Sequence, residues 1–181
     1  MKFYDLSLKR YSVRKYLDKK VDRELIKKCV EAARIAPSAE NVQPWRFLVI
    51  DDPEKLNELK KAAFSGVYSV TKWANSAPVI IVVLAKTDIL ANTIGTFLQG
   101  TQFYLIDIGI ATEHLILQAT ELNLGTCWIG WFNEKKTRKI LNIPSKYKIV
   151  SLVTLGYFEF NEKRTKKHRK KLDKILFFNS L

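Results

Sequence analysis

The chain has 181 residues, of which 47% are apolar and 12% aromatic, so it can bury one hydrophobic core and suits one domain better than two. The longest apolar run, residues 77–85, is too short to cross a bilayer, and residues 1–10 lack the apolar stretch of a signal peptide. We therefore expect a globular, cytoplasmic protein with no membrane partner. The net charge of +13 fits a nucleic-acid partner, an anionic cofactor or simply a lysine-rich surface.

The cysteines and histidines argue against a disulfide-rich protein and against a metal-binding protein. Cys29 and Cys127 are too few for a disulfide framework, and we interpret both as reduced core residues. The two histidines, His114 and His168, stand far apart, and no His or Cys cluster has the spacing of metal ligands. The sequence therefore predicts no metal site.

The N-terminal part of the chain predicts two helices joined by a basic segment. Residues 3–9 are expected to form a short helix, and residues 10–17 are irregular and basic. Asp22 is a good N-cap, because its carboxylate can accept hydrogen bonds from N–H groups of the first helical turn. Apolar residues then recur at helical spacing, which predicts an amphipathic helix over residues 22–35.

A polar loop, a strand and a third helix come next. Residues 37–44 begin and end with proline, which favours a loop because proline does not fit inside regular structure. Residues 45–50 predict a strand. Asp52 followed by Pro53 combines an N-cap with a preferred first helical residue, so we expect a helix from there to about Phe64.

The middle of the chain predicts a central strand and a long helix. A loop with a helical turn at residues 70–74 leads to the continuous apolar run 79–84. Such a run is typical of a strand that is covered on both faces. Residues 97–122 form the longest helical pattern and are apolar nearly all round, which predicts a helix that is buried or lies at a subunit interface.

The C-terminal part adds two strands, a helix and a basic tail. Residues 126–131 and 148–156 predict strands, and Asn133 caps a short helix between them. Because helices and strands alternate, we expect a layered α/β or α+β domain. Eight of residues 163–174 are lysine or arginine, and the apolar residues 175–178 follow. That apolar segment must dock on its own core or on a partner's sheet, and together with the long helix it favours a dimer.

No segment resembles a motif whose side chains alone carry out catalysis. The protein therefore either uses a bound cofactor for its chemistry or catalyses no reaction. Residues 10–14 offer two guanidinium groups and a hydroxyl, which suit a phosphate or form a basic surface turn. The amides of the loop 37–44 could read the edge of a heterocycle or be solvated. The glycine that ends the strand at 125–131 could admit a flat ligand. The tail near Arg169 is a phosphate contact or a solvated charge run.

Taken in this order, the segments resemble the nitroreductase family of FMN-dependent oxidoreductases over nearly the whole chain. The family's Arg-Arg-Ser-x-Arg motif corresponds to Lys-Arg-Tyr-Ser-Val-Arg-Lys-Tyr at residues 9–16, where Tyr11 replaces the second arginine. The other matches are Ala-Pro-Ser to Gln-Pro-Trp at 36–45, Leu-Gly-Thr-Cys-Trp-Ile-Gly at 124–130, Gly-Tyr at 156–157 and Arg-Lys-x-Leu at 169–172. Each motif alone is weak, but five in order at the family's spacing form a specific resemblance.

The resemblance implies a fold, an assembly and a reaction. The fold would be α+β and nitroreductase-like, with a central, mostly antiparallel sheet flanked by helices, in an intertwined homodimer. One domain would span residues 1–181, with the basic extension 163–181 against the partner subunit. FMN would carry hydride from NADH or NADPH through flavin N5 to a nitroaromatic or quinone, in a ping-pong reaction without a catalytic protein acid or base.

Other functions stay open at this point. Flavin-dependent reductive dehalogenation and a step of cofactor synthesis occur in relatives with the same fold. A function of another class would be a basic nucleic-acid-binding module built on the tail, which predicts salt-sensitive binding without flavin. The basic run has no interleaved aromatic residues and no recognition helix, which argues against that module.

The resemblance also implies which residues bind the cofactor. Arg10, Ser12 and Arg14 would hold the phosphate, the ribityl chain and the ring edge of FMN, and Arg169 would join Arg10 at the phosphate. The other implied cofactor-binding residues are Tyr11, Pro37, Ser38, Asn41, Gln43, Cys127, Trp128, Ile129 and Gly130.

Two groups among the implied residues have special positions. Asn41 and Gln43 would reach the flavin that is bound mainly by the other subunit. Trp131 stands where the family often has a small residue, and with Trp73 and Phe103 it would line the acceptor pocket. An indole beside the flavin could narrow that pocket or stack on a planar acceptor.

Overall fold

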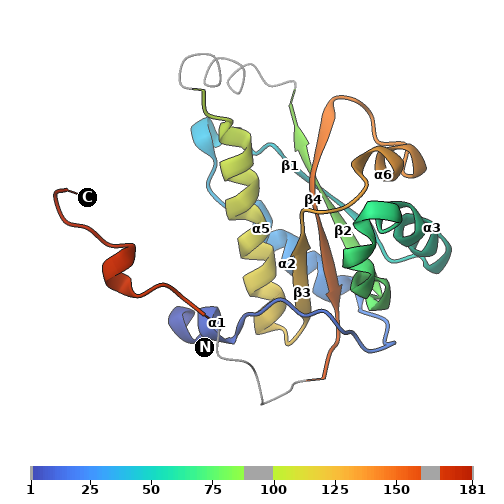
Figure 1. Ribbon diagram of the computed structural model, residues 1–181, viewed down its shortest axis with the longest axis horizontal. Helices are drawn as coiled ribbons and strands as arrows, with labels where there is room; N and C mark the ends of the chain where they lie inside the picture. The colour runs from blue at the N-terminus through green and yellow to red at the C-terminus, as the bar shows by residue number, and fades with distance from the viewer. Residues whose placement is uncertain (1, 88–99, 160–167, 181) are drawn as a thin grey trace.

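The structure is a computed structural model that describes residues 2–87, 100–159 and 168–180. In these residues, a four-stranded antiparallel sheet lies between two layers of helices (Figure 1). The strands follow the order β1 (Trp45–Ile50), β2 (Val79–Lys86), β4 (Tyr147–Gly156) and β3 (Gly125–Ile129) across the sheet. The predicted α+β class and the antiparallel sheet are therefore confirmed.

The helices begin where local capping signals predict them. Asp22 accepts a hydrogen bond from the N–H of Glu24, Asp52 from that of Lys55, and Asn133 from that of Lys136. The helical segments are α1 (Phe3–Lys9), α2 (Arg23–Arg34), η1 (Ala39–Asn41), α3 (Pro53–Ala63), η2 (Gly66–Ser76), α5 (Phe103–Glu121), α6 (Glu134–Ile140) and η3 (Leu172–Lys174).

The central strand β2 is buried on both faces, as its apolar sequence predicts. Alternate side chains point to opposite sides of a strand, so β2 contributes to two separate cores. Val79, Ile81 and Val83 belong to the core that includes α2 and α5. Ile80 and Val82 belong to the core that includes α3 and η2. The sheet therefore packs against helices on both of its faces.

The longest helix is shorter than its sequence pattern predicts. α5 begins at Phe103, because Gly100 has a left-handed backbone (φ +67°) and residues 101–102 are not helical. Residues 97–99 of the predicted helix lie outside the described residues. The side chain of Ile106 is 51% exposed in the single chain, although most of α5 packs against α2 and the sheet. Leu105 beside it is 41% exposed, so the start of α5 presents an apolar surface, and an interface there stays a prediction.

The N-terminal segment lies directly against β3. Ser12 forms a parallel bridge to Thr126, and the N–H of Val13 donates to the Thr126 carbonyl at 2.8 Å. Gly125 permits this close approach. A Cβ at that position would lie 2.8 Å from Val13 Cγ2 and 2.7 Å from Phe158 Cδ1, which is closer than carbon atoms pack.

Replacing Gly125 with alanine is therefore expected to destabilise the fold by about 1–3 kcal/mol, the usual cost of forcing a methyl group into a packed site. The change should lower the melting temperature measured by circular dichroism. Gly130→Ala is the matched control, because a Cβ at Gly130 would meet no atom within 4 Å. Equal melting temperatures for the two variants would show that the packing of Val13 against β3 does not require a glycine at position 125.

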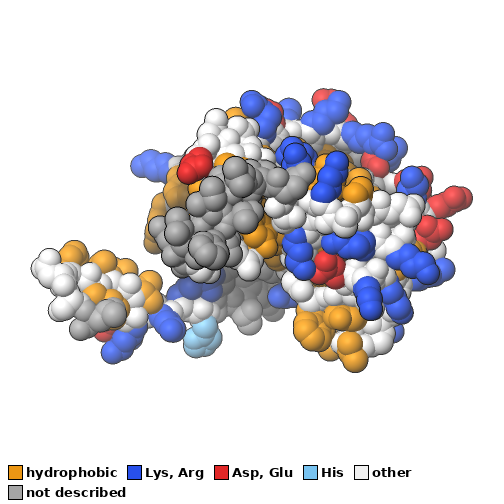
Figure 2. All heavy atoms as spheres, turned by 90° about the horizontal axis from the view of Figure 1, so that it is seen from above, with side chains coloured by type: hydrophobic (Ala, Val, Ile, Leu, Met, Phe, Trp, Pro, Cys, Tyr) orange, Lys and Arg blue, Asp and Glu red, His pale blue; other side chains and the backbone are white. Residues whose placement is uncertain are grey.

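The described part of the basic tail does not pack on the chain's own core. All of residues 168–180 are exposed, and Phe178 is 78% exposed although it is fully apolar. Figure 1 shows this segment extended away from the layered body, and Figure 2 shows apolar side chains on its surface. Docking of the tail on a partner subunit stays a prediction. No helix in the described ranges is long and apolar enough to span a membrane.

Candidate functional site

Three predicted cofactor-binding residues meet beside one cysteine. We call Arg10, Ser12 and Arg14, next to Cys127 of β3, the arginine cluster. Burial raises the pKa of the Cys127 thiol, and the charge of Arg14, the hydroxyl of Ser12 and the charge of Arg10 lower it in part. The thiol is therefore neutral near pH 7 and adds no negative charge beside the two arginines.

The cluster is held in place by buried polar groups that sequence reasoning missed. The Tyr16 hydroxyl donates to the Val13 carbonyl at 2.8 Å and lies 2.7 Å from the Thr154 hydroxyl. Thr154 in turn donates to the Cys127 carbonyl at 3.2 Å. Burial raises the pKa of Tyr16, so its phenol stays protonated. These bonds join residues far apart in sequence, so no local pattern could have revealed them.

The two arginines of the cluster have different neighbours. Arg10 Nε lies 3.9 Å from the Glu113 carboxylate of α5. The Arg14 guanidinium lies 5.6 Å from the centre of the Trp73 ring, which is cation–π geometry. Trp73 belongs to η2, so this element approaches the cluster from the second core.

The C-terminal end of β3 leaves space for a flat ligand. Ile129 is buried, whereas Gly130 is exposed and has free space where a side chain would stand. Trp131 then turns onto η2: its Nε1 donates to the Val67 carbonyl at 3.2 Å, and its ring lies 5.2 Å from the Tyr68 ring. Trp131 and Trp73, both predicted to line the acceptor pocket, therefore contact or belong to the same 3-10 segment.

The loop that carries the predicted amides has an unusual backbone. Glu40, Asn41 and Gln43 adopt left-handed φ angles of 51°, 54° and 48°. Such conformations cost on the order of 1 kcal/mol or more each for residues other than glycine, and they cluster at functional sites. The loop is held by internal hydrogen bonds: the Gln43 N–H donates to Ser38 Oγ at 3.0 Å, and Gln43 Nε2 donates to Asn41 Oδ1 at 2.9 Å.

A buried carboxylate anchors this loop to α5. Asp107 is 3% exposed, and its Oδ1 accepts a hydrogen bond from the Ala39 N–H at 3.0 Å. Its Oδ2 has no partner among the described residues. Burial raises the pKa of Asp107, and the bond from Ala39 lowers it in part. Sequence reasoning missed Asp107; the available signal was one acidic residue within an otherwise apolar stretch of helix.

The segment that carries the arginine cluster and the loop bond near opposite ends of α5, although the Arg10 side chain reaches Glu113, six positions from Asp107. The Lys9 ammonium, next to the cluster, donates to Asn123 just beyond the helix. The loop bonds to Asp107 near the helix start. These two contacts are separated by sixteen positions, or about 24 Å of helix at 1.5 Å per residue. Figure 1 shows the same arrangement, so one chain does not gather all the predicted residues around one point.

Three other predicted residues have no contact with the arginine cluster among the contacts described above. The Tyr11 ring packs edge-on against Phe158, with centroids 5.6 Å apart. Phe103 is the first residue of α5 and lies at the end that holds the loop. Arg169 is in the exposed tail, where its Nη1 donates to the His168 carbonyl. Exposed or half-buried residues also include Pro37, Ser38 and Trp128.

Comparisons with known proteins point in one direction. A family model described as "Nitroreductase family" matches residues 8–157. The chain is 31% identical over 198 residues to a Thermus thermophilus protein named NADH dehydrogenase, covering 95% of this chain and 93% of that protein. It is similar to the solved structure of an FMN-dependent nitroreductase from Clostridium difficile (31% identity, TM-score 0.74, 99% and 100% of the two chains). It is also 28% identical over 197 residues to iodotyrosine deiodinase 1 of Sus scrofa, covering 96% of this chain and 67% of that protein.

Proposed function

Because this chain belongs to the nitroreductase family, we propose that it uses FMN to pass hydride from NADH or NADPH to an electron-poor acceptor. The acceptor class is a nitroaromatic or a quinone. The observation that carries the proposal is the arginine cluster beside Cys127 of β3, together with the exposed Gly130 that follows this strand. A positive cluster suits a phosphate, and exposed backbone at a glycine suits a flat ring.

The residues of the arginine cluster fit FMN in charge and in donor type. Arg10 and Arg14 would neutralise the phosphate and the electron-rich edge of the ring, and the Ser12 hydroxyl would hydrogen-bond the ribityl chain. Ile129 and Gly130 would offer backbone groups to the ring. FMN supplies the hydride chemistry when it is bound, while the protein binds and orients it.

We further propose that the site is completed by a second copy of the chain. Asn41 and Gln43 lie in a loop that bonds to Asp107 near the start of α5, whereas Lys9, next to the cluster, bonds to Asn123 beyond the end of that helix. Both loop residues have a left-handed backbone. The exposed side chain of Ile106 and the exposed apolar residues of the tail would be covered in a dimer. In that assembly the loop and Phe103 would serve the partner's flavin.

The protein's own groups would act by binding and positioning rather than by proton transfer. The Cys127 thiol is neutral near pH 7 because of burial, and the Tyr16 phenol is bonded into the wall behind the cluster. We assign neither group a catalytic role. The positive charges of Arg10 and Arg14 would favour a reduced, anionic flavin.

The experiment that tests this function is purification followed by an absorbance spectrum and turnover assays. The protein is expected to be yellow, or to become yellow when FMN is added, and to oxidise NADH or NADPH with a nitroaromatic or quinone acceptor. Colourless protein that cannot be reconstituted with FMN would refute the cofactor assignment. Flavin-loaded protein that reduces none of these acceptors would refute the reductase assignment and leave the binding.

Reductive deiodination is the second candidate function, because a relative over nearly the whole chain is named iodotyrosine deiodinase. Release of iodide from 3-iodotyrosine by the reduced protein, without reduction of quinones, would favour that function. The opposite profile would favour the first.

A further inference from the structure

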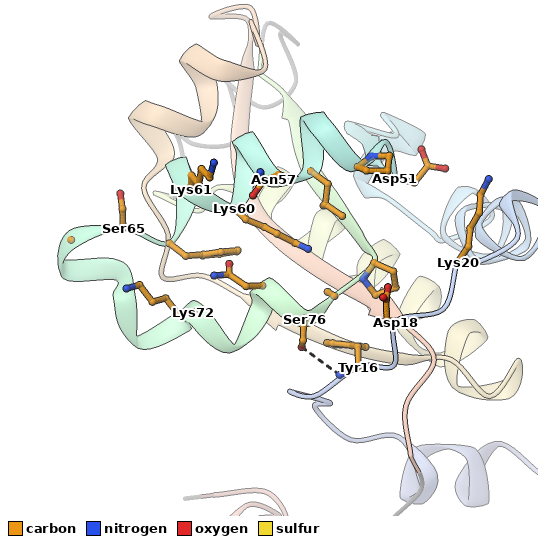
Figure 3. Close-up of a pocket in the computed structure, with 17 residues that line it drawn as sticks. Tyr16, Asp18, Lys20, Asp51, Asn57, Lys60, Lys61, Ser65, Lys72 and Ser76 are labelled. Carbon is orange, nitrogen blue, oxygen red and sulfur yellow. Dashed lines mark hydrogen bonds between the residues drawn. The ribbon is translucent and has the colours of Figure 1, made fainter.

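A cavity of about 980 Å³ lies between α3, η2 and the extended residues 16–20 (Figure 3). Tyr16 is part of its lining, and none of residues 10–14 lines it. Its volume falls within the upper range of small-molecule sites, about 300–1,000 Å³. The function proposed above does not use it.

The charge of this cavity is strongly positive. Its lining includes four lysines, Lys20, Lys60, Lys61 and Lys72, and two acidic residues, Asp18 and Asp51. Asp51 is already neutralised by Arg23, which makes two hydrogen bonds to its carboxylate at 2.7 and 2.9 Å. Asp18 is therefore the remaining acidic group against four ammonium groups, an excess that suits a ligand with more than one negative charge.

Lys60 is half-buried, whereas the other three lysines of the lining are exposed. Figure 3 shows its side chain extended from α3 into the cavity, toward the side where Tyr16 and Asp18 lie. The side chain is half-buried, and burial lowers the pKa of its ammonium, which Asp18 partly offsets. In the described part of the chain no group accepts a hydrogen bond from it. Its N–H donors therefore face the cavity, where an anionic ligand can accept hydrogen bonds from them.

The floor of the cavity is apolar. Leu56, Phe64 and Ala77 line it but are already packed in the core, whereas Pro53 and Pro78 keep exposed apolar surface. A bare inorganic anion would use the lysines and leave this floor in contact with water. A ligand with both an apolar body and an anionic group would use both parts.

We propose that this cavity is a second ligand site for a small organic phosphate. The apolar body lies on Pro53 and Pro78, and the phosphate accepts a charge-assisted hydrogen bond from Lys60. Lys61, Lys72 and Lys20 add to the positive field around it. This inference does not rest on the proposed flavin chemistry, because it uses none of the residues assigned to it.

The test is isothermal titration calorimetry of the protein as purified, with phenyl phosphate, inorganic phosphate and phenol as probes. Phenyl phosphate is expected to bind one site per chain at least about tenfold more tightly than either of the other probes. Lys60→Met should weaken that binding at least about tenfold, because it removes the charge and keeps the apolar stem. Lys55→Met, a change of the same charge on the same helix outside the cavity, should leave it within about twofold.

Several results would overturn the proposal. These are no binding of phenyl phosphate, equal binding by Lys60→Met with an unchanged melting temperature, and equal affinity for inorganic phosphate. Release of bound flavin during the titration would also overturn it, because the probe would then occupy the flavin site. Failure of the FMN assignment would appear separately, as colourless protein that still binds phenyl phosphate.

Discussion

Arg10→Glu is expected to produce a protein that purifies without flavin. The change replaces a guanidinium of the arginine cluster with a carboxylate, which repels a phosphate and sets two acidic groups together with Glu113. A hydrogen bond to a charged group contributes about 1.5–3 kcal/mol, so the FMN dissociation constant should rise on the order of a hundredfold. Flavin fluorescence quenching on titration with the apoprotein measures this constant.

Lys15→Glu is the matched control for this experiment. It makes the same change of charge one residue beyond the cluster, on an exposed side chain. It should retain FMN within a few-fold, since exposed charges contribute little. Full flavin retention by Arg10→Glu, or equal losses in both variants, would refute the role of Arg10 at the phosphate.

The loop variant Asn41→Gly/Gln43→Gly is expected to weaken FMN binding by about ten- to a hundredfold. Glycine permits the left-handed backbone at both positions and keeps the bond from the N–H of residue 43 to Ser38, so the change removes the two side-chain amides and the bond between them. Two hydrogen bonds at about 0.5–1.5 kcal/mol each account for that range. The measurement is the same fluorescence titration, combined with sedimentation to show that the variant still forms the wild-type assembly.

Glu40→Gly serves as the control for the loop. Glu40 has the same left-handed backbone but no assigned contact with the flavin. It should bind FMN as the wild type does. If Asn41→Gly/Gln43→Gly also binds FMN normally, the two amides do not contact the cofactor in either subunit.

Much of the fold could be predicted because its signals are local. Asp22, Asp52 and Asn133 cap helices through hydrogen bonds to residues two or three positions away, so the sequence pattern is sufficient. The apolar run of β2 identifies a central strand for the same reason. The predicted start of α5 was too early, because the helical pattern of the sequence continues through residues 100–102, which are not helical.

The site could be predicted only in part. Residues 10–14 and β3 were identified by family resemblance, and the structure adds the contacts that bring them together. The bond between Asp107 and Ala39 and the network behind Tyr16 join distant parts of the chain, so only the folded structure reveals them. The same is true of the Lys60 cavity, whose lining comes from three separate segments.

The central claim is that each flavin site combines the arginine cluster of one subunit with the amide loop of the other. The most direct measurement is the flavin content of mixed dimers, prepared from an Arg10→Glu subunit and an Asn41→Gly/Gln43→Gly subunit that carry different affinity tags. If the loop acts across the interface, each mixed dimer contains one intact site and should bind one FMN with wild-type affinity, although neither variant alone does so. If both parts act within one chain, the mixed dimer has no intact site, and the absence of tightly bound FMN would contradict the account.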